Sequence, residues 1–395
     1  MRFCLLTGAK PYLAANVRSL TPLDYDQWVE YCNSPADTTT LAKQRAADGS
    51  REPFGVTYWG VGNESWGCGG NFLPQEYAME FRRFTTWVPN YGMKLKFIGA
   101  GPGAEIGNPG VDWTRGFFEA LASKDKNIFK RLYGLSLHYY CGSTGKRNSI
   151  EFSVADWYQL LWQASVMDSL LTEHWLAMGE TDREHNAKLV VDEWGAVQRG
   201  PSIDPRYLFS YPPTMRDALV TGITLDIFNR HAEKIAMCNV AQLINNIHTL
   251  FLGLGDRFVV TPNFWVFDMY KAHRGGQSLR FLSEAPLVSY SYGGNHKTLW
   301  GVAGSASLHQ KEKTLVVTVV NPNVSEELTT EIVLHGASAR SGRATVLAEA
   351  DIHAYNDFDH PHAVRPSDGP AKVSGARFTW TFKPASVTKL VIDLV

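Results

Sequence analysis

The sequence predicts an α/β chain in two parts, a parallel sheet flanked by helices and then an antiparallel β-sandwich. In the first part, short apolar runs alternate with segments of helical period, which is typical of βαβ units. From about Leu279 onward the helical period disappears, and apolar residues alternate with polar ones as in a sandwich. We therefore expect two domains, residues 1–278 and residues 279–395.

The expected elements follow from the spacing of apolar residues. Buried strands are expected where β-branched and aromatic residues cluster, at residues 11–17, 56–64, 95–100, 132–140, 189–194 and 237–243. Helices are expected where apolar residues recur every three to four positions, at residues 74–88, 111–122, 154–178 and 215–234. Sandwich strands are expected at residues 314–320, 328–334, 343–347 and 378–382.

Composition narrows the class of ligand. The chain has 395 residues, 44% of them apolar, which is enough for a large core. Its 38 basic and 39 acidic residues are spread without long runs, so neither a nucleic acid nor a membrane surface is an expected partner. A neutral ligand fits better, and 12 Trp and 16 Tyr suit stacking on sugar rings. The five cysteines show no paired spacing and no run is long enough to span a membrane, so we expect a cytoplasmic protein with reduced thiols.

Two acidic residues stand at the predicted ends of two strands. Glu64 closes the run 56–64, and Glu193 lies near the end of the run 189–194. In parallel α/β architectures functional groups gather where strands end, because the following loops converge on one mouth. Glycoside hydrolysis needs such a pair, with one carboxyl protonated for the leaving oxygen and one ionised for the anomeric carbon. Asn63 adds an amide for a nearby sugar hydroxyl. A helix N-terminal charge is the plainer alternative for either glutamate alone.

Eight stretches of the chain together resemble one known family. They read PYLAANV, WVEYCN, YWGVGNESWG, SLHYY, VVDEWG, MRDAL, IFNRHAEKIAMCNVAQLIN and FDMYKAH. These stretches resemble glycoside hydrolase family 51, the α-L-arabinofuranosidases, over nearly the whole chain. The resemblance implies a (β/α)₈ TIM-type barrel followed by a sandwich. It also implies a retaining, exo-acting, homo-oligomeric enzyme that removes terminal arabinofuranosyl residues from hemicellulose or arabinan saccharides, with no metal and no cofactor.

The resemblance implies a role for each matching site residue. Glu64 is the general acid/base and Glu193 the nucleophile. The implied substrate-binding residues are Asn63, His138, Tyr140, Trp194 and Gln242. Tyr140 would also hydrogen-bond the nucleophile. A core role is the plain alternative for His138 and Tyr140, and a structural hydrogen bond for Gln242. The family often has a second Trp shortly after DEW, which this chain lacks, so stacking on the leaving-group side is expected to differ.

A closed barrel needs eight strands, and only six are predicted ahead of the sandwich. If Glu64 follows strand 4 and Glu193 strand 7 of the family barrel, the first two strands are missing and the chain is short at its amino terminus. The exposed sheet edges would favour a partner subunit. The absence of these two strands from the barrel wall would either abolish activity or widen the subsite that holds the sugar.

Three other interpretations stay open. An endo-acting β-glucanase or xylanase would use the same carboxyl pair in a cleft of different shape. A non-catalytic carbohydrate-binding remnant would be consistent with the missing strands. The Asp- and His-rich segment 351–362 could hold a divalent metal, although an ordered surface loop is the plainer interpretation.

Overall fold

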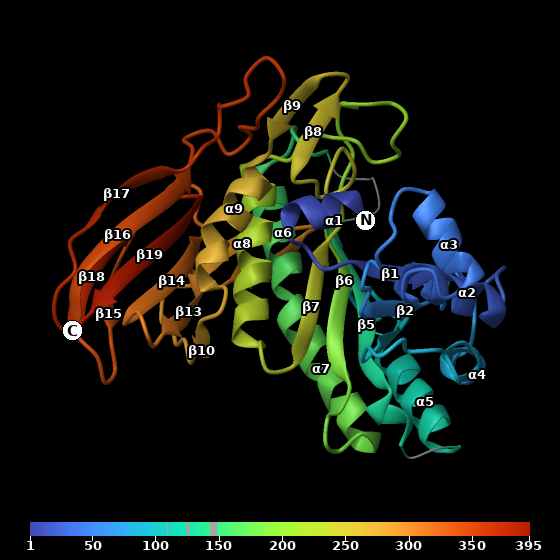
Figure 1. The fold of residues 1–395 in the computed structure, drawn as a ribbon. Coiled ribbons are helices and arrows are strands. Elements are labelled where there is room, and N and C mark those ends of the chain that lie inside the picture. The colour runs from blue at the N-terminus through green and yellow to red at the C-terminus, as the bar shows by residue number, and fades with distance from the viewer. Residues whose placement is uncertain (109, 125–126, 143–147) are drawn as a thin grey trace. The chain divides into compact units, whose positions relative to one another are not determined.

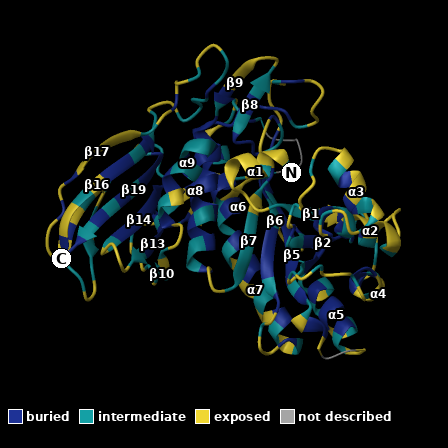
Figure 2. Ribbon diagram, in the orientation of Figure 1, coloured by how far each residue is buried: buried dark blue, intermediate teal, exposed yellow. Residues whose placement is uncertain are grey.

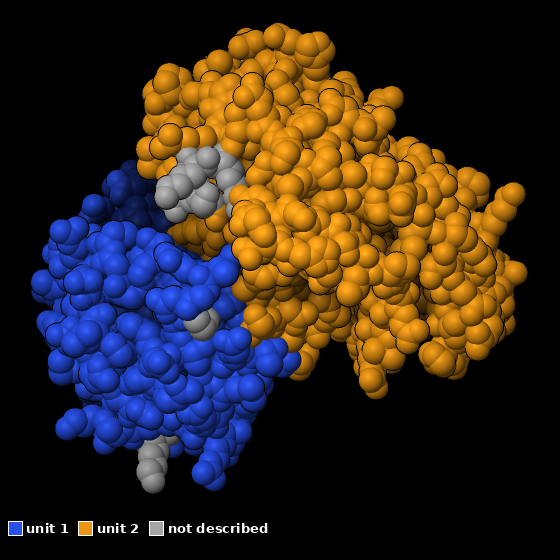
Figure 3. Space-filling model, turned by 180° about the vertical axis from the view of Figure 1, so that it is seen from behind, with its two compact units in different colours: residues 1–138, 170–192, 234–237 blue, residues 139–169, 193–233, 238–395 orange. Residues whose placement is uncertain are grey.

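The computed structural model describes residues 1–108, 110–124, 127–142 and 148–395 (Figure 1). The chain divides into two compact units, which Figure 3 shows in different colours. Unit 1 comprises residues 1–138, 170–192 and 234–237, and unit 2 comprises residues 139–169, 193–233 and 238–395. The predicted boundary between residues 278 and 279 stays a prediction.

The parallel sheet expected in the first part is present. Its strands follow the order β1, β2, β3, β5, β6, β7, and β4 pairs with β5. The pairs β1–β2, β2–β3 and β3–β5 are parallel. Figure 1 labels β1, β2, β5, β6 and β7. The bounds of the strands are β1 Tyr12–Ala15, β2 Tyr58–Val61, β3 Lys96–Gly99, β4 Gly103–Ala104, β5 Leu132–Gly142, β6 Lys188–Val197 and β7 Ile235–Val240. All six predicted runs therefore contain a strand.

Helices alternate with these strands as predicted, and three more lie ahead of β2. The helices with residues in unit 1 are α1 Arg2–Thr7, α2 Pro22–Asn33, α3 Thr40–Ala47, α4 Pro74–Thr85, α5 Val111–Ala122, η1 Ile128–Lys130 and α7 Met167–Thr181. α2 begins with a capping box, in which the Thr21 hydroxyl accepts from the Asp24 N–H and the Asp24 carboxylate accepts from the Thr21 N–H. This cap and Pro22 at the first helical position define where the helix starts.

A buried tyrosine ties the ends of two strands together in unit 1. Tyr77 of α4 is fully buried, and its hydroxyl donates to the carbonyl oxygen of Val61. The same hydroxyl accepts from the N–H of Ala100 at 2.6 Å. Since Val61 ends β2 and Ala100 follows β3, Tyr77 satisfies backbone groups at the points where both strands stop. The turn after β2 therefore starts from a fixed position.

Three predicted boundaries are wrong. β2 ends at Val61, so Glu64 lies beyond the strand rather than on it. β6 continues to Val197, so Glu193 lies inside a strand. The single helix predicted over residues 154–178 is two helices, α6 (Val154–Ser165) and α7, separated by Val166. The apolar period continues across that break, which is why the pattern did not reveal it.

The remaining helices belong to unit 2. They are α6, α8 (Met215–Arg230), α9 (Pro262–Tyr270) and η2 (Lys271–His273), and a hairpin of β8 (Phe251–Leu254) and β9 (Arg257–Val260) precedes α9. α8 begins with a capping box between Thr214 and Asp217, and both of these side chains are fully buried. A capping carboxylate in the interior has to satisfy its remaining lone pairs with other protein groups.

The carboxy-terminal strands form an antiparallel sandwich, as predicted. One sheet has the order β10, β13, β14, β19, β16, β17, and the pairs β15–β18 and β11–β12 form two smaller sheets. The bounds are β10 Gln277–Leu279, β11 Val288–Tyr292, β12 Asn295–Leu299, β13 Ala303–His309, β14 Thr314–Asn321, β15 Leu328–Val333, β16 Ala339–Ala348, β17 Ser367–Ala371, β18 Arg377–Phe382 and β19 Ser386–Leu394. Phe378 and Phe382 of β18 pack with Leu390 and Ile392 of β19 in one buried cluster. Figure 2 shows β19 mostly in the dark blue of buried residues.

A buried carboxyl anchors α8 to this sheet. Asp226 accepts hydrogen bonds from Ser305 at 2.7 Å, Thr318 at 2.5 Å and Tyr270 at 2.8 Å. Burial raises the pKa of Asp226 to about 7, and the three hydrogen bonds oppose that rise. α8 is thus fixed at its carboxy-terminal half by polar contacts from three other elements.

Within the described ranges, no helix combines the length and apolar content that crossing a membrane requires.

Candidate active site

Glu64 lies in a tight turn that follows β2. Its φ is 46°, in the left-handed region that residues with a Cβ seldom adopt. Its carbonyl oxygen accepts hydrogen bonds from the N–H groups of Gly67 and Gly69, each at 2.9 Å. A Cβ on Gly69 would lie 1.7 Å from the Asn63 carbonyl oxygen, so this turn requires glycine there. Non-glycine residues in such conformations concentrate at functional sites.

Both carboxyl oxygens of Glu64 have partners within unit 1. Oε1 lies 3.2 Å from Nδ1 of His138, and Oε2 accepts from Sγ of Cys68 at 3.1 Å. The hydrogen bond with His138 lowers the pKa of Glu64 most, and partial burial opposes it. The bond from Cys68 lowers this pKa further. In this state Glu64 therefore favours its ionised form.

His138 of β5 lies between two carboxylates. Its Nδ1 faces Glu64, and its Nε2 lies 3.1 Å from Oδ1 of Asp192 on β6. The other oxygen of Asp192 accepts from the hydroxyl of Tyr12 at 3.0 Å. The contact with Glu64 is a hydrogen bond, whereas Asp192 Oδ1 lies at ion-pair distance without hydrogen-bond geometry. His138 therefore links Glu64 to the strand that carries Asp192.

Glu193 has its own partner in unit 2. The hydroxyl of Tyr140 on β5 donates to Oε2 of Glu193 at 2.7 Å. This is the contact that the resemblance implies for Tyr140. A hydrogen bond to a carboxylate is short and directional. Glu193 is thus held in one orientation as an acceptor.

Trp194 is deeply buried next to Glu193. Its ring is surrounded by Phe228, Phe267 and His248, with ring centroids 5.4 to 6.1 Å apart. Only 1% of the residue is exposed. These neighbours favour a packing role, and the contact of Trp194 with substrate stays a prediction.

The two predicted amide contacts lie outside regular structure. Asn63 is exposed in the turn after β2. Gln242 is exposed beyond the end of β7, where its Oε1 accepts from Nδ2 of Asn246 at 3.2 Å. The sequence predicted a strand over residues 237–243 that includes Gln242, but β7 ends at Val240, so Gln242 lies outside it. Both amides have side chains that solvent can reach.

Three side chains of this arrangement were not predicted. Cys68 contacts Glu64, Asp192 contacts His138, and Tyr12 contacts Asp192. Asp192 stands in the VVDEWG stretch, where a second carboxylate beside the candidate nucleophile was a usable signal. Tyr12 is separated from Asp192 by 180 positions and carries no such signal.

The Asp- and His-rich segment 351–362 is an ordered loop. Nδ1 of His353 contacts Oδ1 of Asp351 at 2.9 Å, and its Nε2 contacts the carbonyl oxygen of Phe152 at 2.9 Å. Asp357 accepts from the backbone N–H of His360 at 2.5 Å. These side chains therefore satisfy one another and nearby backbone groups.

Two family models match the chain. The α-L-arabinofuranosidase 1 domain matches residues 14–124, and the α-L-arabinofuranosidase C-terminal domain matches residues 192–386. Each match includes one of the candidate glutamates. The matched regions extend over both the helical part and the sandwich.

Known proteins are similar over most of the chain. An intracellular exo-α-L-arabinofuranosidase of Bacteroides ovatus is 30% identical over 371 residues, which are 93% of this chain and 69% of that protein. An intracellular exo-α-(1→5)-L-arabinofuranosidase of Bacillus subtilis is 25% identical over 91% of this chain and 70% of that protein. The crystal structure of the GH51 arabinofuranosidase from Xanthomonas axonopodis pv. citri is similar with a TM-score of 0.89 and 32% identity, over 99% of this chain and 77% of that one.

Proposed function

The chain belongs to the α-L-arabinofuranosidases of glycoside hydrolase family 51, and on that premise we propose that it releases terminal arabinofuranosyl residues by double displacement at Glu64 and Glu193. The names of the Bacteroides and Bacillus relatives support exo action. Hemicellulose-derived and arabinan-derived saccharides are the substrates that this activity would use. The endo-acting alternative has no comparable support.

In the proposed reaction the two carboxyl groups act on opposite sides of the anomeric carbon. Glu64 donates a proton to the leaving oxygen while Glu193 attacks the anomeric carbon and forms a glycosyl ester. Glu64, now ionised, then removes a proton from water, which displaces Glu193 and releases arabinose. This mechanism requires the two carboxyl groups to lie about 5–5.5 Å apart.

One observation supports the pairing most directly. Each glutamate is hydrogen-bonded to a residue of β5, Glu64 to His138 and Glu193 to Tyr140. These two β5 residues are two positions apart, and positions i and i+2 of a strand point to the same face. Asp192, the partner of His138, directly precedes Glu193 in β6. We propose that Asn63, Gln242 and Trp194 complete the substrate-binding residues.

His138 should set the pH range of the acid step. Replacing His138 with Phe keeps a ring but removes the hydrogen bond that lowers the pKa of Glu64 most. The pKa of Glu64 then rises, so its protonated form persists to higher pH. We expect the basic limb of the kcat/KM profile for an aryl α-L-arabinofuranoside to move to higher pH.

The conservative His138→Asn variant is the control for this experiment. An amide can still donate to Glu64 Oε1, so its basic limb should move less than that of His138→Phe. A basic limb that stays in place or moves to lower pH in His138→Phe would contradict the proposed role of His138.

A panel of nitrophenyl glycosides tests the proposed function. We expect rapid release of nitrophenol from the α-L-arabinofuranoside and little from the β-xyloside or β-glucoside. On arabinan the product should be single arabinose, formed first as the α anomer because the reaction retains configuration. Oligosaccharide products would indicate an endo-acting enzyme, and no turnover of any glycoside would indicate a carbohydrate-binding remnant.

We further propose a cytoplasmic location and a homo-oligomer. The Bacteroides and Bacillus relatives are both named as intracellular enzymes, which supports the proposed location. Light scattering after gel filtration would give the number of subunits.

A further inference from the structure

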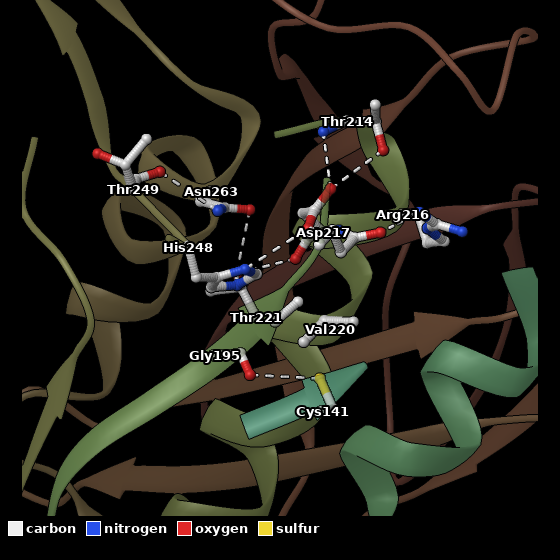
Figure 4. Close-up of polar contacts among 12 residues, drawn as sticks. Cys141, Gly195, Thr214, Arg216, Asp217, Val220, Thr221, His248, Thr249 and Asn263 are labelled. Carbon is white, nitrogen blue, oxygen red and sulfur yellow. Dashed lines mark hydrogen bonds and ion pairs between the residues drawn. The ribbon is translucent and has the colours of Figure 1, made fainter. Parts of the chain in front are cut away.

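Unit 2 contains a cluster of polar side chains that the proposed reaction does not use, and one of them packs against β6 close to Glu193. All of its members are fully buried, and they are Gln198, Thr214, Arg216, Asp217, Thr221, His248 and Asn263. Figure 4 labels all of them except Gln198 and shows His248 beside Asp217 and Thr221. We call them the His248 cluster. Buried polar groups are costly unless they are hydrogen-bonded, so such a cluster calls for an explanation.

One turn of α8 holds both ends of the His248 ring. Nε2 of His248 lies 2.8 Å from Oγ1 of Thr221, and Nδ1 lies 3.6 Å from Oδ1 of Asp217. Asp217 and Thr221 are four residues apart, so they lie on the same face of the helix. The contact at Nε2 is a hydrogen bond, so the imidazole cannot rotate without losing Thr221, and Asp217 flanks the other nitrogen without hydrogen-bonding it.

Asp217 is itself fixed by other members of the cluster. Its Oδ2 accepts from the backbone N–H of Thr214 at 2.9 Å, and its Oδ1 accepts from Nε2 of Gln198 at 2.7 Å. Gln198 in turn accepts from Nη2 of Arg216, so an amide bridges the buried carboxylate and the buried guanidinium. The opposite charges of Asp217 and Arg216 are thus linked within the interior, and Thr214 and Gln198 fix the position of Asp217.

His248 packs directly on the strand that carries Glu193. A Cβ on Gly195 would lie 2.4 Å from Cβ of His248, which is closer than any real contact. Gly195 also has a φ of 146°, which favours glycine. It is two residues beyond Glu193 in β6. The ring therefore occupies the space that any larger residue at position 195 would need.

The backbone of His248 ties a second segment to the same strand. Its N–H donates to the carbonyl oxygen of Ala241 at 2.9 Å, and the N–H of Ala241 donates to the carbonyl oxygen of Trp194 at 3.0 Å. Ala241 directly precedes Gln242, which we propose as a sugar contact. The strand of Glu193 and the segment of Gln242 are therefore both fixed to His248.

We infer that His248, hydrogen-bonded to Thr221 and flanked by Asp217, is a positioning residue for the nucleophile Glu193 and for Gln242. This inference rests on the proposed function of Glu193. A small displacement of β6 moves the carboxylate away from the line of attack on the anomeric carbon, and a misplacement of about 1 Å can cost roughly 100-fold in rate. Glu64 and His138 are not part of the cluster, so we expect its main effect on attack by Glu193 and not on protonation of the leaving group.

Two threonines of α8 provide a matched test. Thr221→Val removes the hydroxyl that contacts His248, whereas Thr224→Val removes a hydroxyl that bonds only along the helix, to the carbonyl oxygen of Val220 at 2.8 Å. Both threonines are buried, and Thr221 likewise bonds to the carbonyl oxygen four residues earlier. Thr221→Val also removes a contact with Asn263 and leaves Nε2 of His248 without its hydroxyl partner, so it should lose more thermal stability than Thr224→Val. Both activities are therefore measured well below both melting temperatures.

We expect Thr221→Val to lower kcat/KM for aryl arabinofuranosides about tenfold or more, and Thr224→Val to stay within about twofold of wild type. The loss in Thr221→Val should be equal for good and poor leaving phenols, because nucleophilic attack is impaired and not proton donation. Equal activities of the two variants would overturn the inference, as would a loss that disappears with the better leaving phenol.

Gly195→Ala is a second test that does not depend on Thr221. We expect a loss of roughly 100-fold, because the new Cβ displaces His248. Gly369→Ala in β17 is its control, since a Cβ there meets open space. If Gly195→Ala is as active as Gly369→Ala, the inference is wrong. Glu193→Ala in the same assay tests the proposed function alone. An active Glu193→Ala enzyme would contradict the proposed function, whereas an inactive one leaves only the role of His248 in question.

Discussion

Replacing Glu193 with alanine should lower kcat for an aryl α-L-arabinofuranoside by at least about 10⁴-fold, since loss of a nucleophile costs about that much or more in other hydrolases. Without the carboxylate no glycosyl ester can form, and the hydroxyl of Tyr140 loses its partner. Release of nitrophenol gives the rate. Added azide should restore some turnover by direct attack and yield the β-L-arabinofuranosyl azide, with inverted configuration.

The control for this variant is Glu312→Ala. Glu312 is an exposed acid in the turn between β13 and β14 of the same unit, so its loss should leave the rate unchanged. A Glu193→Ala enzyme that retains activity within about tenfold of wild type would exclude Glu193 as the nucleophile.

Glu64→Ala should have a different kinetic signature. The variant lacks the acid for the first step and the base for the second, so we expect kcat to fall by about 10²–10⁴-fold. The loss in kcat/KM should be largest for poor leaving groups, because acidic phenols leave without protonation. A burst of phenol should precede a slow steady state as the glycosyl ester accumulates.

Azide provides the decisive measurement for Glu64. An anion can attack the glycosyl ester without a base, so azide should restore turnover and give the α-L-arabinofuranosyl azide, with retained configuration. The control is Glu52→Ala, an exposed acid of unit 1 that pairs with Arg51. An azide product with inverted configuration, or no effect of azide, would contradict the role of Glu64.

Much of the fold could be predicted because its signals are local. The predicted helix at residues 111–122 is α5 with the same bounds, and all six predicted runs contain strands of the parallel sheet. Periodicity arises from the repeat of a single element, so it survives without knowledge of its neighbours. It fails where two elements share one period, as at Val166 between α6 and α7.

The candidate site was only partly predictable. The GNE and DEW stretches identified Glu64 and Glu193, because each lies close to the end of a recognisable apolar run. The left-handed backbone of Glu64 was not foreseen, since it depends on the close approach of Gly69 to the Asn63 carbonyl oxygen. The partners Tyr12 and Asp192 were not foreseen either, because nothing in one segment specifies its contact with another 180 positions away.

The order of strands and helices, the change from helical to sandwich pattern, and the two acids on which the chemistry depends can all be read from the amino-acid sequence. The groups around those acids become visible only in the folded chain: His138 beside Glu64, Tyr140 on Glu193, and the ring of His248 against Gly195. This difference arises because a residue's preference for helix or strand acts over a few neighbours along the chain. Hydrogen bonds and packing act between atoms that only the folded chain brings within a few ångströms.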